Sequence, residues 1–189
     1  QAAETAEIKV KGTIRPPACI PAFAGGDTVD YGVILTKSLR ANNFTQLETR
    51  SISFTVTCDA NIQIAIAATD NRASSRVSGV GGLTDMHIFG LGSVDGKNVG
   101  GYTLLLGTNI KVDGNSPRYN MYRSNSTTSG SWTPGWDRTA RIDNNAKYIF
   151  TVGDGYTPTT GKVWTFDMQL TAYLNTPEKL NLAGSIPLD

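Results

Sequence analysis

The stretch SISFTVTC, residues 51–58, alternates polar and apolar side chains at every step. A period of two predicts a β-strand with one buried and one solvated face, as is typical of antiparallel sheets. Residues 163–174, VWTFDMQLTAYL, repeat the pattern over a longer stretch, and isoleucine recurs at every second position from 62 to 66. The apolar members of these segments are the predicted core: Ile52, Phe54, Val56, Ile62, Ile64, Ile66, Trp164, Phe166, Met168 and Leu170.

Strand and turn signals continue on both sides of these segments. Residues 101–106 and 147–152 are further strand candidates, and glycine, aspartate and asparagine clusters separate the strands. The predicted turns lie at 25–27, 59–61, 95–96, 113–115 and 153–155. Because no segment carries a helical stripe, helix should be confined to a turn or two. The predicted fold is all-β, an immunoglobulin-like β-sandwich in a single domain spanning residues 1–189.

The two cysteines, Cys19 and Cys58, each lie in a predicted strand, the first at the end of residues 8–19 (IKVKGTIRPPAC). An even cysteine count on strands favours one structural disulfide, a bond that persists in a periplasm or outside the cell. The alternative is two buried free thiols. With His87 as the only histidine, two cysteines cannot complete a zinc site by themselves.

Composition excludes several classes of function. The net charge is +1 and no basic run exists, which argues against a nucleic-acid partner. No apolar run approaches the roughly 20 residues that span a bilayer. The chain starts without a charged and hydrophobic leader, so we expect an exported protein to be present here in its mature form.

Catalytic motifs are missing from the sequence. A single histidine, His87, removes most acid–base and metal chemistry at neutral pH, and no nucleophile elbow occurs. The glycines of residues 90–96 lack the spacing of a dinucleotide-binding loop. We therefore expect a non-enzymatic protein with no catalytic residues, no cofactor and no metal.

Several motifs together resemble a known family. Residues 12–14 (GTI), 17–19 (PAC) and 54–59 (FTVTCD) are similar to the cysteine pattern of pilins of the chaperone–usher pathway. A closer resemblance is to a pilin-like family of Gram-negative bacteria, most of whose members have no assigned function. Its echoes extend to TVDYG (28–32), AATDNRA (67–73), FGLG (89–92) and IPLD (186–189).

The resemblance implies a structural or tip-associated subunit of a surface fimbria, exported through the periplasm and joined by donor-strand addition. It also implies that Cys19 and Cys58 are bonded, and that the partners are a periplasmic chaperone, an outer-membrane usher and neighbouring subunits. In such pilins the sandwich lacks its last strand. Because this chain stops at Asp189, we expect an open apolar strip lined by residues 163–174 or 8–14, with residues 1–7 as a short N-terminal extension.

A second hypothesis is a free-standing adhesin domain that binds a host or surface glycan. Trp132 and Trp136, with Asp137 and Arg138, lie in the polar stretch 124–138, and exposed tryptophans offer large contact areas to sugars. The other interpretation of these tryptophans is that they anchor their loop onto the sandwich.

Overall fold

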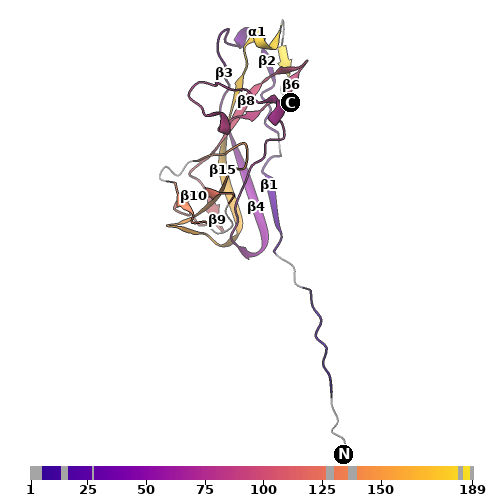
Figure 1. Cartoon of the computed structure of the whole chain (residues 1–189), viewed down its shortest axis with the longest axis vertical. Coiled ribbons are helices and arrows are strands. Elements are labelled where there is room, and N and C mark those ends of the chain that lie inside the picture. The colour runs from indigo at the N-terminus through magenta and orange to yellow at the C-terminus, as the bar shows by residue number, and fades with distance from the viewer. Residues whose placement is uncertain are drawn as a thin grey trace, which may run out of the picture.

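A computed structural model describes residues 6–13, 17–26, 28–126, 130–135, 140–182 and 185–187. The described chain is almost entirely β-structure, in antiparallel sheets that form an elongated, sandwich-like body (Figure 1). This confirms the predicted all-β sandwich-like fold.

The main sheet is built on the two strands with the cleanest alternation, β4 (Arg50–Ile62) and β15 (Gly161–Leu174), which pair with each other. The order across the sheet is β1 (Cys19–Phe23), β4, β15, β8 (Gly100–Leu106) and β12 (Ala140–Arg141). Three two-residue strands are attached beside it: β3 (Thr45–Gln46) and β9 (Lys111–Val112) on β15, and β5 (Phe89–Gly90) on β8.

A second sheet covers one end of the main sheet. Its order is β11 (Thr133–Pro134), β10 (Tyr119–Ser124), β13 (Tyr148–Asp154) and β14 (Thr157–Pro158). Two small pairs complete the β-structure: β2 (Val33–Leu35) with β16 (Ser185–Pro187), and β6 (Ser93–Val94) with β7 (Lys97–Asn98).

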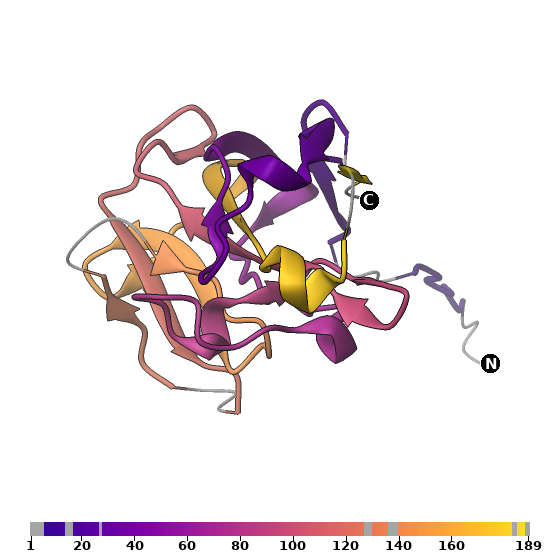
Figure 2. The same ribbon diagram turned by 90° about the horizontal axis from the view of Figure 1, so that it is seen from above.

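Helix is limited to single turns, as the sequence predicts. The α-helix α1 (Pro177–Leu180) begins where the Thr176 side chain accepts the Lys179 N–H, and ends at Asn181 in the left-handed conformation. Short 3₁₀ turns occupy Thr36–Ser38, Ala73–Ser75 and Asp85–His87. Along the long axis, α1 lies at the opposite end of the body from β10 of the second sheet (Figure 1), and the view from above looks onto this end (Figure 2).

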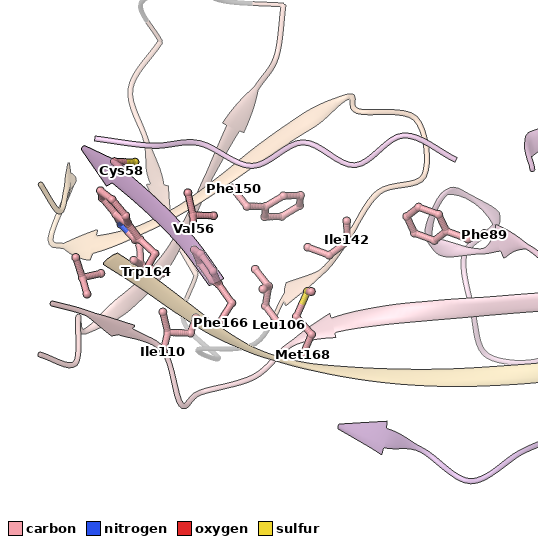
Figure 3. Packing of buried hydrophobic residues seen from close by; sticks show 12 residues of the cluster. Val56, Cys58, Phe89, Leu106, Ile110, Ile142, Phe150, Trp164, Phe166 and Met168 are labelled. Atoms are coloured by element: carbon pink, nitrogen blue, oxygen red, sulfur yellow. The ribbon is translucent and has the colours of Figure 1, made fainter. Parts of the chain in front are cut away.

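The main core lies between the two sheets. The register places Phe54 opposite Phe166 and Val56 opposite Trp164, so their side chains share one face of the main sheet. Figure 3 shows Val56, Trp164 and Phe166 within this cluster. Trp164 and Phe166 are fully buried, and Phe150 packs against this cluster from the second sheet. Of the predicted core, Val56, Trp164, Phe166 and Met168 are buried, and Ile52, Phe54, Ile62, Ile64 and Ile66 are partly buried against them. Leu170 is half-buried and borders an open cleft instead.

Three local predictions are wrong. Residues 8–13 form no strand, because they extend away from the body and meet no partner edge among the described residues (Figure 1). Residues 59–61 form no turn, since β4 continues to Ile62, and Asp59 holds Ala18 through two hydrogen bonds of 3.0 Å. Ile64 lies outside any strand, and Ile66 makes only an isolated bridge to Phe150.

The disulfide joins the first residue of β1 to β4. Cys19 and Cys58 lie directly opposite each other in the antiparallel register, and their sulfurs are bonded at 2.06 Å. This confirms the disulfide and excludes the two free thiols.

Candidate functional site

A cleft of about 950 Å³ opens over the part of the main sheet that the second sheet leaves uncovered. Its floor continues the core face of the sheet, because the register aligns Leu170 with Leu104 and Ala172 with Tyr102. Ile52 of β4 completes this apolar floor. A cleft lined by core-facing side chains exposes apolar surface that a further strand or ligand would bury.

The near wall of the cleft is the chain that follows β1, residues 23–26 and 28–31. The β1–β4 pairing ends at Phe23↔Phe54, and the next main-chain bond is from the Ala24 N–H to the Ser53 carbonyl. Among the described strands, residues 50–52 of β4 therefore pair with β15 alone. An unpaired strand edge presents main-chain donors and acceptors to an incoming segment.

The far wall, residues 69–72 and 90–91, is held by the buried carboxylate of Asp70. Asp70 Oδ2 accepts from Arg76 Nε at 2.7 Å and from the Gly90 N–H at 3.1 Å, and Oδ1 accepts from the Arg72 N–H at 3.0 Å. The Asp70 side chain is only 2% exposed, so these charge-assisted bonds are shielded from water. The far wall is therefore preformed.

Two tyrosines, Tyr31 and Tyr102, are among the polar residues that line the cleft. Burial raises the pKa of Tyr102 above 10.0, and the nearby Asp70 carboxylate raises it further. Burial likewise raises the pKa of Tyr31, while the Arg50 guanidinium, 4.9 Å from the centre of its ring, acts in the opposite direction. Both phenols stay neutral at pH 7, and Tyr31 donates its hydroxyl to the Glu48 carbonyl at 2.7 Å.

The N-terminal segment, residues 6–13, is a second place, besides the cleft floor, where apolar side chains are exposed. Residues 6–13 are exposed throughout and run away from the body beyond the start of β1 (Figure 1). Ile8 is 89% exposed and Val10 is 92% exposed, and their spacing places both side chains on one face of an extended chain. Lys9 and Lys11 alternate with them.

Only part of the predicted glycan site lies within the described structure. Trp132 is half-buried, and the Arg123 guanidinium lies 4.7 Å from the centre of its ring, covering one face. Arg123 also donates to the Gly130 carbonyl at 3.2 Å, a pair of contacts that fits the interpretation in which Trp132 anchors its loop. Trp136, Asp137 and Arg138 lie outside the described residues. The glycan-binding role of all four residues stays a prediction.

His87 lies in the 3₁₀ turn Asp85–His87 and contacts a buried carboxylate. Its Nε2 is 3.2 Å from Oδ1 of Asp143, a carboxylate that is 3% exposed. Burial raises the pKa of Asp143, and the His87 interaction and the Tyr148 N–H partly offset that rise. The neighbouring Asn144 amide donates to the carbonyls of Asp85 and Ile88, so the group ties the 3₁₀ turn to the chain before β13.

No metal-ligating cluster of three or more histidine, cysteine or acidic residues occurs in the part of the chain that the structure describes. Within the same residues, no helix is long and apolar enough to cross a membrane.

Sequence reasoning missed most of the cleft. Tyr102 and Leu104 belong to a strand that was predicted, but the uncovered part of its face depends on which segments lie above it. The Asp70–Arg76 pair lies in a polar stretch with no alternation, where the sequence predicts no strand. The alternation of Ile8 and Val10 is visible in the sequence, although it reads there as part of a strand in the body.

The comparisons with known proteins place the two cysteines within a matched region. Residues 8–87 match the model of a family described as "Protein of unknown function (DUF1120)". The chain is 34% identical over 126 residues to "Uncharacterized protein YhcF" of Escherichia coli (strain K12), covering 58% of this chain and 53% of that protein. It is 32% identical over 112 residues to "Protein GltF" of the same strain, covering 50% and 44%. The chain thus spans about half the length of the curated relatives it matches, and no solved structure matches it.

Proposed function

We propose that this chain is a non-enzymatic subunit, structural or tip-associated, of a chaperone–usher surface fimbria, and that it assembles by donor-strand addition. In strand addition, main-chain hydrogen bonds supply affinity while alternate side chains of the incoming segment fill pockets. The chain has a candidate acceptor for such a segment and a candidate donor.

The acceptor is the cleft. An extended segment could pair with the main chain of β4 at residues 50–52, which among the described strands pair with β15 alone. Every second side chain of that segment would then lie on the floor side of the sheet, beside Ile52 of β4 and toward Leu170 of β15. Burial of a leucine-sized side chain there would contribute about 1.5–3 kcal/mol.

The donor is the N-terminal segment of a neighbouring copy. The observation that carries the proposal is that Ile8 and Val10 are about nine-tenths exposed, on an extended segment whose described residues, 6–13, are all exposed. A soluble domain rarely keeps such alternation in the open unless a partner buries it. Insertion of Ile8 and Val10 would leave Lys9 and Lys11 at the outer face, where their charges stay in water.

The same surfaces explain the expected export partners. An open cleft and a free strand edge promote aggregation, so a periplasmic chaperone would cover them until an outer-membrane usher delivers the neighbouring subunit. The localisation that follows is an extracellular fimbria, reached through the periplasm. The disulfide fits that oxidising route.

A peptide of residues 6–15 tests the proposal in a thermal-shift assay with the full chain. We expect the unfolding temperature to rise with peptide concentration, because ligands that bind only the native state stabilise it. A peptide with Lys9 and Lys11 replaced by serine should act like the parent, whereas one with Ile8 and Val10 replaced by serine should have no effect. Equal shifts for both altered peptides, or no shift with the parent, would contradict donor-strand addition here.

A further inference from the structure

The N-terminal segment leaves the body at the same point as the disulfide. β1 starts at Cys19, and the described chain before it, residues 6–13 and 17–18, is fully exposed. Figure 1 shows this segment continuing beyond the end of the body where β1 begins, roughly along the long axis. Any pull on the segment therefore reaches the body first at the two hydrogen bonds between Ala18 and Asp59, and next at the covalent bridge of Cys19.

β1 is poorly suited to withstand that pull by itself. All five of its residues are exposed, Ile20 at 69% and Phe23 at 41%, and its ladder partner is β4. Its far end is held by one aromatic contact, in which the rings of Phe23 and Phe54 are 5.1 Å apart. Elements with few buried contacts and exposed main-chain bonds open at the lowest free energies.

β4 is a much stronger anchor. It pairs with β15 from Arg50 to Thr57 and, after a shift in register, again at Ile62, and its inward side chains are part of the main core. The bridge connects Cys19 to Cys58 of β4, whose residue is only 5% exposed. The covalent path from the N-terminal segment to the largest sheet thus bypasses the β1–β4 hydrogen bonds.

The position of the bridge also matters for the cleft, because β1 runs directly into its near wall at residues 23–26. If β1 were stripped from β4, Phe23 would leave the wall and the cleft would lose one side. We propose that the Cys19–Cys58 bridge carries tension from the N-terminal segment into β4, and so keeps that tension off β1 and the near wall of the cleft. The inference rests on the proposed function in one respect, since tension arises only where a neighbouring subunit holds the segment.

The consequence for a fibre is that a load on the N-terminal segment of one subunit does not disturb the cleft of the same subunit, where the next subunit is bound. A load that stripped β1 in one subunit would open the cleft in which that subunit holds its own neighbour. With the bridge intact, the load passes through the core strands instead. The bridge would then make the subunit resistant to tension as well as thermally stable.

Single-molecule force spectroscopy on the isolated full chain, held at its two termini, tests this inference. With the bridge reduced in the folded protein, we expect an early extension at low force, as residues 19–32 are released up to β2. At about 3.6 Å per residue this step would reach at most about 50 Å. The oxidised chain should unfold without that step.

A second attachment provides the matched control. When the N-terminal handle is moved to Asn43, in an exposed loop, the pull no longer passes through β1 and the early step should vanish even in the reduced chain. A C19A/C58A chain should behave like the reduced one, and the reduced protein serves alone if that variant does not fold. An early step in the oxidised chain, no early step in the reduced chain, or the same step from Asn43 would overturn the inference. No donor peptide is present, so the result is independent of whether peptide binding succeeds.

Discussion

Replacing both cysteines by alanine should lower the free energy of unfolding by about 4 kcal/mol. The bridge closes a loop with a sequence separation of 39, and the chain-entropy relation gives this value for a loop of that length. The native state itself should change little, because the side chains of β1 are exposed and Asp59 still holds Ala18 by two hydrogen bonds. Most of the loss should therefore come from the greater freedom of the unfolded chain.

Equilibrium urea unfolding, followed by both tryptophan fluorescence and far-ultraviolet circular dichroism, measures this loss. With a slope of about 2 kcal/mol per molar urea, the midpoint should fall by about 2 M at unchanged slope. Cys19→Ala alone should lose about as much as the double variant, because either change removes the bridge. A loss below about 1 kcal/mol in the double variant would refute the assignment of the stabilisation to loop closure.

Three further predictions concern the core and the buried charges. Phe166→Ala should lower the free energy of unfolding by about 3–5 kcal/mol in urea unfolding. Val163 is 39% exposed on the outer face, so Val163→Ala should cost under about 1 kcal/mol. Similar losses for the two variants would show that the faces are misassigned. Because burial raises the pKa of Asp143, the native state binds the proton of the Asp143 carboxyl group more tightly than the unfolded chain does. The free energy of unfolding should thus fall as pH rises from 3.8 through the raised pKa, and Asp143→Asn should flatten that slope; an unchanged slope would argue against it. Asp70→Ala should lower the free energy of unfolding by about 3 kcal/mol. This value is near the lower end for a broken buried ion pair, because the Arg76 side chain is 32% exposed. An unchanged free energy in urea unfolding would contradict a preformed far wall.

The sequence predicted the parts of the fold that depend on local alternation. The strands β4 and β15 lie where alternating side chains place them, because a half-buried strand needs one apolar face wherever it lies in the sheet. The strands β8 and β13 lie at the two further segments that were predicted as strands. The disulfide was predicted as well, since an even number of cysteines on strands favours a structural bridge.

The parts that failed depend on what lies next to a segment in space. Ile8 and Val10 have the alternation of a body strand, yet no edge of the body receives them. Asp59 has the composition of a turn residue, but its carboxylate holds the Ala18 N–H and the strand runs on. The cleft could be expected from the family resemblance, while its floor and preformed wall follow only from the register of β8 and from the contacts of Asp70.

Photo-crosslinking tests the central claim, donor-strand addition into the cleft, most directly. The peptide of residues 6–15 would carry a photoreactive side chain at the position of Ile8 or, in a matched peptide, at that of Lys9, and mass spectrometry would locate the crosslinks. We expect the Ile8 probe to label the cleft floor around Ile52 and Leu170, and the Lys9 probe not to reach it. Equal labelling of the floor by both probes, or crosslinks scattered over the surface away from the cleft, would contradict the claim.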